Sequence, residues 1–518
     1  MKLVSRVSYS IWKRLLNTQL KKPKSLQWIQ PEGFKTDISL YNPLLKSKIP
    51  LILRNKNVVT WYMCGPTLYD SAHIGHASTY VRFDTIRRIM SEFFNLDVIL
   101  IMGLTDIDDK IIRRAIDSNQ PWKNVTKFYE EEFFKDMKSL NVATPYMSCR
   151  VTDHIPQIIE FVDKILKKGA AYVAQDGSVY FDTLKYGKYG KFNRIQLETP
   201  NADKKSSSDF ALWKASKRNE PFWESPWGNG RPGWHIECSV MASNIFGNNI
   251  DIHSGGVDLV FPHHENEEAQ SCCYHDTDQW INYWIHAGHL YEKGDVKMSK
   301  SLKNTISIES FLEKYTANQF RMLCLMTNYR RGIEFSDGAM QNAVSTLKKI
   351  QNFISDCDNY VAGKQKCGCV DESSLLLSLN DTRNRVLESL ADDFNTFEAI
   401  QSIVELVGIG NKMLNQDWEV SHARSTTAVA TVSNYLTTVL SKLGLLDSTN
   451  LEGTQFNLTQ VVETFVKFRE SVRSKALEDP KTNKEVLKAC DEARNNLIAC
   501  GIQIKDQKNT SSWSLVKN

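Results

Sequence analysis

Apolar segments and polar loops follow one another in a regular order over the first part of the chain. Residues 58–63 are β-branched, aromatic and apolar, which is typical of a strand buried in a parallel sheet. A Gly-Pro break follows at 65–66, and residues 80–90 carry apolar side chains at helical spacing. A second apolar run at 97–102 precedes another polar loop and a helical stretch that ends near 116. Two strand–loop–helix units in succession predict a parallel sheet covered by helices.

The pattern changes twice further along the chain. From about 146, an amphipathic helix at 154–168, short strand-like runs and a polar loop predict an insertion into the sheet. After 310 the spacing is helical, and helices are expected at 342–356, 375–389 and 394–413. A linker then leads into two last helices.

The sequence therefore predicts an α/β, doubly wound parallel-sheet (Rossmann-like) domain with a connective insertion, then an α-helical bundle and a small C-terminal region. The predicted boundaries are 40–145 and 231–310 for the two halves of the sheet domain, 146–230 for the insertion, 311–446 for the bundle and 455–518 for the C-terminal region.

Length and composition agree with several globular domains. A chain of 518 residues is too long for one hydrophobic core, and 42% hydrophobic with 24% charged residues is ordinary for a globular protein. No apolar run approaches the roughly 20 residues that a membrane-spanning helix needs. We therefore expect no membrane partner.

The net charge of +4 comes from the first residues of the chain. Residues 1–31 contain seven Lys or Arg and no Asp or Glu, and Leu3, Val7, Ile11 and Leu15 share one helical face. This segment lacks the uninterrupted apolar core of a secretory signal, and it predicts a mitochondrial transit peptide that ends near residue 31. A basic tail without structure and a chloroplast signal are the alternatives. The eleven cysteines show no disulfide-framework spacing, which indicates a reducing compartment.

Two segments carry residues suited to binding phosphates. His73-Ile-Gly-His76 lies where the first predicted strand turns into a helix, and a helix N-terminus favours anions. Gly75 leaves room for a flat ring to approach the backbone. Lys297-Met-Ser-Lys-Ser301 offers two ammonium groups and two hydroxyls in a polar loop. Taken alone, the two histidines are a modest signal, and a short loop with two surface histidines is the alternative.

A third constellation is suited to a metal ion. Cys238, His263 and Glu267 offer sulfur, nitrogen and oxygen donors, and His263 and Glu267 are four residues apart, so they share a helical face. Cys64, at the end of the first predicted strand, supplies a fourth donor, and this mixture suits Zn²⁺. His264 in place of His263, His253 as a further ligand, and a Cys238 that is merely buried remain open. Three acids at 106, 108 and 109 are candidates for Mg²⁺ or, more simply, for helix N-caps.

Six motifs occur in order and together resemble one family. They are Cys64-Gly-Pro-Thr-Leu-Tyr-Asp, His73-Ile-Gly-His, Thr105-Asp-Ile-Asp-Asp-Lys, Gly233-Trp-His-Ile-Glu-Cys, Phe261-Pro-His-His-Glu-Asn-Glu and Lys297-Met-Ser-Lys-Ser. On these motifs the chain resembles the cysteinyl-tRNA synthetases of class I from about residue 40 to its end. With its basic leader it is similar to the mitochondrial form, which implies the mitochondrial matrix.

The resemblance implies roles for individual residues. The implied zinc ligands are Cys64, Cys238, His263 and Glu267; the implied ATP-binding residues are His73, Gly75, His76, Asp258 and Lys300; the implied catalytic residues are His73, His76, Lys297 and Lys300; and the implied cysteine pocket contains Gly65, Thr105 and Trp234. The implied partners are L-cysteine, ATP with Mg²⁺, and tRNA(Cys), bound by a monomer. The bundle and the C-terminal region would bind the tRNA, the latter at its anticodon.

The chain departs from the family pattern at a few positions. Ser254 replaces a common Gly, Lys303 replaces a Gly after the lysine loop, and Gln507 and Asn509 replace a Thr and a Gly in the tail. None of these is an implied ligand or signature histidine. The tail substitutions make the anticodon contacts there less secure.

Three other functions are compatible with the same motifs: two replace tRNA charging and one would be additional to it. A ligase that joins cysteine to an amino-sugar should lack a full anticodon region, whereas about 200 residues follow the lysine loop here. An RNA-binding paralogue without catalysis should have lost a signature histidine or a zinc ligand. Family members are also linked to cysteine persulfide formation with pyridoxal phosphate on lysines near Lys110 and the 297–301 loop, but Lys110-Ile-Ile-Arg113 keeps one lysine of that pair.

Overall fold

The computed structural model describes residues 27–192, 204–292, 296–297, 305–364, 369–416, 424–445, 458–507 and 510–515. The predicted transit peptide up to residue 26 and residues 298–304 of the lysine loop lie outside the described residues. The chain forms two units, Met1–Leu446 and Asp447–Asn518, which we describe separately. In the part of the chain that the structure describes, every helix is too short or too polar to span a membrane.

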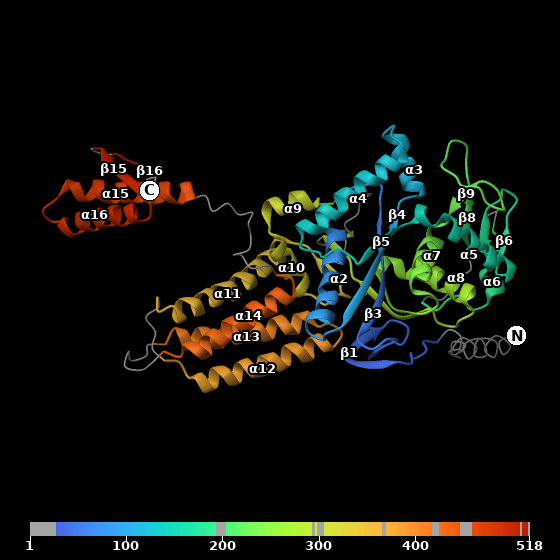
Figure 1. Ribbon diagram of the computed structural model, residues 1–518, viewed down its shortest axis with the longest axis horizontal. Coiled ribbons are helices and arrows are strands. Elements are labelled where there is room, and N and C mark those ends of the chain that lie inside the picture. The colour runs from blue at the N-terminus through green and yellow to red at the C-terminus, as the bar shows by residue number, and fades with distance from the viewer. Residues whose placement is uncertain are drawn as a thin grey trace, which may run out of the picture. The chain divides into compact units, whose positions relative to one another are not determined.

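A five-stranded parallel sheet forms the centre of the first unit, with the strand order β11-β10-β3-β4-β5. Its strands are β3 (Val58–Thr67), β4 (Asp97–Thr105), β5 (Met147–Arg150), β10 (Ile250–Gly256) and β11 (Ile281–Ala287). One face is covered by α2 (Ile74–Glu92) and α4 (Trp122–Ser139), and the other by α5 (Ile155–Lys167), α7 (Trp234–Phe246) and α8 (Glu265–His275) (Figure 1). The predicted doubly wound α/β fold is confirmed.

Side-chain alternation along β3 divides the core between these two faces. Trp61 and Met63 join the core under α2, whereas Tyr62 and Cys64 join the core under α7 and α8. The chain proceeds outward from β3 through β4 to β5, then returns to the other side of β3 with β10 and β11. The strand order therefore reverses between β3 and β10, and ligands of such sheets bind beyond the carboxyl ends of the strands at that point.

The predicted insertion contains a second, antiparallel sheet with the order β6-β7-β8-β9. Its strands are β6 (Ala171–Val173), β7 (Val179–Phe181), β8 (Phe210–Ala215) and β9 (Gly230–Pro232), and α6 (Thr183–Tyr186) follows β7. The predicted insertion starts at 146, but β5 at 147–150 still belongs to the parallel sheet. The antiparallel sheet therefore fills only the later part of the predicted range.

Helices dominate the rest of the first unit, as predicted. They are α9 (Ile308–Lys314), α10 (Ala317–Leu325), α11 (Asp337–Val361), α12 (Glu372–Ala391), α13 (Thr396–Leu414) and α14 (Thr426–Lys442). The three helices expected at 342–356, 375–389 and 394–413 are present; α11 and α12 extend beyond those bounds, whereas α13 begins two residues later than expected. Short strands β12 (Leu290–Glu292), β13 (Val296–Lys297) and β14 (Ile333–Glu334) form a small sheet, and a hairpin of β1 (Phe34–Asn42) and β2 (Ser47–Leu53) precedes β3. The helix α3 (Asp109–Asp117) follows β4.

Asp393, in the turn between α12 and α13, fixes the bundle to the sheet domain. Its carboxylate accepts hydrogen bonds from Tyr41 N (2.9 Å), the Tyr329 hydroxyl (2.8 Å) and Arg330 Nε (2.8 Å). Asp393 and Phe394 are both buried and both adopt positive φ, at 60° and 52°. Such backbone conformations are costly for residues other than glycine, so these contacts must hold the turn in place.

The second unit is a small α/β module with its own core. It consists of α15 (Leu458–Glu478), α16 (Lys484–Ala499) and an antiparallel hairpin of β15 (Ile502–Gln507) and β16 (Thr510–Leu515). Val462, Val466, Ile502 and Ile504 form the core. The two helices were predicted, whereas the hairpin was not, because its pairing joins two short polar-rich segments.

Candidate active site and metal centre

His73 caps the N-terminus of α2, at the turn after β3. Its Nδ1 accepts a hydrogen bond from Gly75 N at 3.1 Å, so a neutral His73 carries its proton on Nε2. The rings of His73 and His76 are stacked with centroids 3.9 Å apart, and His76 is exposed. The first turn of α2 contains no acidic residue, so its positive dipole end is left to attract an anion.

The segment after the lysine loop lies against this helix start. Ile74 N donates to Ile306 O at 3.1 Å, and His73 forms a β-bridge with Ser307. Lys297 lies in β13, where its backbone pairs with β12, and Lys300 lies outside the described residues. The two ends of the loop are therefore anchored to the sheet domain, while the roles of both lysines stay predictions.

Four buried side chains from different elements converge near the end of β3. Cys64 Sγ lies 3.9 Å from Cys238 Sγ of α7 and 3.9 Å from Glu267 Oε1 of α8. His263 Nε2, just before α8, lies 3.0 Å from the same Glu267 oxygen. One ligand atom from each of these four residues lies within 4.8 Å of all the others. This group offers a donor set for a metal ion.

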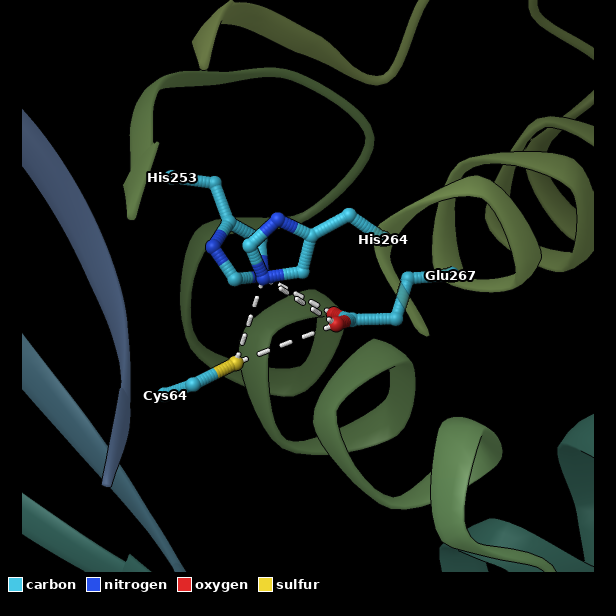
Figure 2. Close-up of side chains that lie close together, drawn as sticks. All are labelled: Cys64, His253, His264 and Glu267. Carbon is cyan, nitrogen blue, oxygen red and sulfur yellow. Dashed lines mark hydrogen bonds and ion pairs between the residues drawn. The ribbon is translucent and has the colours of Figure 1, made fainter. Parts of the chain in front are cut away.

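Two further histidines form an overlapping group with Cys64 and Glu267 (Figure 2). His264 Nε2 lies 3.6 Å from Cys64 Sγ, and His253 Nε2 lies 2.8 Å from Glu267 Oε2. The Trp284 ring stacks on His253, with centroids 4.7 Å apart. Both alternative ligands considered from the sequence thus reach the same place, and proximity alone does not choose between the sets.

Charge in this cluster is unevenly shared. The hydrogen bond from Cys64 lowers the pKa of Cys238 to about 6, although burial alone would raise it. A hydrogen bond with His263 lowers it further. Burial and the same sulfur contact raise the pKa of Cys64. Burial would raise the pKa of Glu267, but His253 and His263 lower it to about 2. Cys238 and Glu267 are therefore anionic near neutral pH and ready to accept a cation.

Two of the predicted cysteine-pocket residues, Gly65 and Trp234, adjoin this cluster. Cys64 is followed by Gly65, where a Cβ would lie 2.3 Å from Gly103 O, so only glycine allows the strands to approach here. Trp234 starts α7 with its ring 4.4 Å from that of His263, and Thr105 Oγ1 donates to Glu237 Oε2 at 3.2 Å. Asp258, which is exposed, lies 3.9 Å from His289 Nε2. Their binding roles stay predictions.

Sequence reasoning missed the residues that hold the first turn of α8. Glu265, next to the cluster in sequence, accepts hydrogen bonds from the backbone N–H groups of Gly190, Lys191 and Phe192 at 2.7–3.0 Å. Lys191 Nζ also binds Glu268 Oε1 at 2.7 Å, and both side chains are buried. Burial lowers the pKa of Lys191, but Glu268 and its neighbours outweigh this and raise it overall. The run of acids at 265, 267 and 268 could have indicated these contacts, because buried carboxylates need hydrogen-bond or cationic partners.

Replacing Lys191 with methionine is expected to lower the free energy of unfolding by about 3–5 kcal/mol, because Glu268 keeps a buried charge without its cation. Chemical denaturation measures the change. Lys188→Met is the matched control, since its partner Asp278 and Lys188 itself are about half exposed, and it should cost less than about 1 kcal/mol. A loss as small as that of the control would contradict the prediction.

Other charged candidates do not converge on the site. Asp108 caps α3 by accepting from Lys110 N at 2.9 Å, which confirms the N-cap interpretation for this residue. Asp106 instead binds Thr152, and Asp109 binds Lys214 and Arg231. These carboxylates are engaged separately rather than gathered around one cation.

In the second unit, three arginines of α15 and α16 surround one acid of the hairpin. Arg469 makes two hydrogen bonds to Asp506, at 2.7 and 3.0 Å, and Arg473 and Arg494 lie at 3.6 and 3.3 Å from it. These contacts lower the pKa of Asp506, Arg469 first among them. The three arginines therefore join the helices of the module to its hairpin, and Arg469 is buried there rather than solvated.

The comparisons with known proteins agree with this architecture. Residues 51–345 match the family described as tRNA synthetases class I (C) catalytic domain. The solved structure of Mycobacterium tuberculosis methionyl-tRNA synthetase with methionyl-adenylate superposes with a TM-score of 0.52 at 14% identity, over 74% of this chain and 89% of that chain. At that identity the likeness concerns the fold, which is that of the class I aminoacyl-tRNA synthetases.

Two curated relatives narrow the family. The chain is 43% identical to the probable mitochondrial cysteine--tRNA ligase of Xenopus tropicalis, over 94% of this chain and 91% of the relative. It is 38% identical to the cytoplasmic cysteine--tRNA ligase of Dictyostelium discoideum, over 94% and 79% respectively. The chain belongs to the cysteine--tRNA ligase family. The two relatives differ in compartment, so the family alone does not assign one.

Proposed function

We propose that this chain joins L-cysteine to tRNA(Cys) through a cysteinyl-adenylate, with a zinc ion that selects cysteine, for translation in mitochondria. One observation supports this most strongly. A buried cluster of thiol, imidazole and carboxylate groups lies at the reversal point of a parallel sheet, one strand–helix turn away from two stacked histidines at a helix N-terminus. The first group suits a sulfur-binding metal and the second suits a polyphosphate.

The donor set fits zinc. Zinc bonds of about 2.0–2.3 Å in a tetrahedron separate the ligand atoms by about 3.3–3.8 Å. Cys64, Cys238, His263 and Glu267 are separated by comparable distances, with 3.9 Å between the two sulfurs and 3.0 Å between His263 and Glu267. His253 binds the second oxygen of Glu267, which is the usual place of a residue that orients a ligand. We therefore favour this set over the one with His253 and His264.

Bound zinc would supply a soft Lewis acid that prefers a thiolate to an alcohol. Serine is nearly isosteric with cysteine, and packing alone would separate the two by only about 1–3 kcal/mol. Trp234, beside His263, would close the pocket, and Gly65 and Thr105 would line it. With this selection no editing domain is needed.

The chain's own residues then position the reaction. The cysteine carboxylate attacks the α-phosphorus of ATP, and pyrophosphate leaves. His73 and His76 donate hydrogen bonds to phosphate oxygens, assisted by the N–H groups of α2, by Lys297 and Lys300 and by Mg²⁺ bound with ATP. Gly75 and Asp258 would flank the nucleotide. In the second step the 2′-hydroxyl of the terminal ribose attacks the adenylate carbonyl, and AMP leaves. Orientation and charge stabilisation supply the rate.

The remaining segments would serve the tRNA and targeting. We propose that residues 311–446 bind the tRNA, that 455–518 bind its anticodon, and that 146–230 are the connective insertion, in a monomer. The basic, acid-free composition of residues 1–31 and the name of the Xenopus relative support import into the matrix.

The test uses protein that lacks residues 1–31. Cysteine-dependent pyrophosphate exchange and charging of tRNA(Cys) are measured with zinc-loaded and zinc-stripped protein, with serine as the competing substrate. We expect both activities with zinc, and serine activation at least tenfold below cysteine. Exchange without charging would favour an amino-sugar ligase, and no exchange would favour a paralogue without catalysis. Fusion of residues 1–31 to a fluorescent protein tests mitochondrial import. Fluorescence that stays in the cytosol would refute import by this segment.

A further inference from the structure

Tyr62 buries a hydroxyl group that has no hydrogen-bond partner among the described residues. The side chain is 0% exposed, and it lies at the centre of the sheet on β3. A buried polar group without a partner typically costs about 1–3 kcal/mol. Such a group calls for an explanation, since phenylalanine would fill the same space at lower cost.

The surroundings of Tyr62 hold this hydroxyl in one place. A Cβ at Gly103 of the neighbouring strand would lie 1.9 Å from the Tyr62 oxygen, so the hydroxyl occupies the space that glycine leaves free. The Tyr62 ring packs edge-on against His253, with centroids 5.1 Å apart. Two constraints, one from β4 and one from β10, therefore fix the direction of the ring.

The hydroxyl faces the metal cluster. Tyr62 and Cys64 are two residues apart on β3, so their side chains leave the same face of the sheet. Gly103, against which the Tyr62 oxygen packs, is the strand partner of Cys64, and Met241 of α7, three residues after Cys238, borders the same space. The hydroxyl is therefore a hydrogen-bond donor placed beside the part of the cluster that contains the two sulfur atoms.

We propose that the Tyr62 hydroxyl donates a hydrogen bond to the Cys238 thiolate when the cluster holds its metal ion. This inference rests on the proposed zinc site. Metal ligation holds both cluster sulfurs, Cys64 included, as thiolates in fixed positions, which gives the unpartnered donor a fixed, charged acceptor. A hydrogen bond to the sulfur orients the thiolate toward the metal, which supports metal binding, and offsets part of its negative charge, which leaves the metal able to accept a further thiolate from the substrate. Tyr62 is then a positioning residue for the metal centre, and Gly103 is the residue that admits it.

Tyr62→Phe in the zinc-loaded full chain tests the proposal. Loss of an outer hydrogen bond to a metal ligand typically costs roughly 10–100-fold in metal affinity, so zinc transfer to a chromogenic chelator should be faster by a similar factor. In zinc-stripped protein the same change should leave the unfolding temperature unchanged or higher, because it removes an unpartnered group. With Co²⁺ in place of zinc, the thiolate-to-metal absorption band should move to lower energy.

Tyr283→Phe is the matched control, because its hydroxyl is already engaged away from the cluster, between Ile52 N and Pro50 O. Tyr283→Phe should destabilise the zinc-loaded and the zinc-stripped protein alike and leave the rate of zinc release unchanged. Unchanged zinc release and an unchanged cobalt band in Tyr62→Phe would overturn the hydrogen bond while leaving the zinc site intact. Wild-type protein that binds no zinc would overturn the metal site and this proposal together.

Discussion

Replacing Cys64 with serine is expected to reduce cysteine-dependent pyrophosphate exchange by at least about 100-fold and to leave ATP affinity nearly unchanged. Cys64 Sγ contacts both Cys238 and Glu267, so the variant removes a central donor of the cluster. A serine hydroxyl ionises poorly and is a weak zinc ligand. Since even the outer partners of metal ligands are worth roughly 10–100-fold, a direct ligand should be worth more. ATP affinity should persist because His73 and His76 belong to α2.

Steady-state exchange assays over cysteine and ATP concentrations separate the two effects, and metal analysis reports zinc content. Cys149→Ser is the matched control, because Cys149 is a free cysteine buried in the same core, on β5. It should cost stability without loss of zinc or of cysteine selection. If Cys64→Ser primarily lost ATP binding, the division of labour along this strand–helix turn would be wrong.

Replacing His73 with asparagine is expected to lower the rate of cysteine activation by about 10²–10³-fold while the fold stays as stable as before. Removal of one preorganised donor from a charge-stabilising site typically has this effect. The imidazole also caps α2 through Nδ1, and the asparagine oxygen can accept the same hydrogen bond from Gly75 N. The variant therefore separates catalysis from helix capping.

Single-turnover formation of the adenylate measures the first property, and thermal unfolding measures the second. His73→Ala should lose both, with an additional cost of about 0.5–2 kcal/mol for the missing cap. Activation by His73→Asn at the wild-type rate would exclude His73 from charge stabilisation. If His73→Asn and His73→Ala lost the same amount of stability, asparagine would not restore the helix cap.

Local pattern was enough to predict much of the fold. The apolar runs at 58–63 and 97–102 each predict a buried strand, and both strands are there, side by side and parallel. Helical spacing also predicted α11, α12 and α13, since these helices bury one continuous stripe each. The end of the parallel sheet was less predictable. β5 has only four residues, and its pairing with β4 depends on neighbours distant in sequence.

By itself, the sequence determined which chemistry this protein carries. Ordered motifs indicate the family and the candidate donors of a metal site and of a phosphate site, because residue type and local spacing can be read directly from the chain. Only the tertiary structure decided what surrounds them. Tyr62 and Gly103 meet at the cluster because β3 pairs with β4, and Lys191 meets Glu268 across 77 positions of sequence. Such partners depend on strand register and burial, which no local spacing encodes.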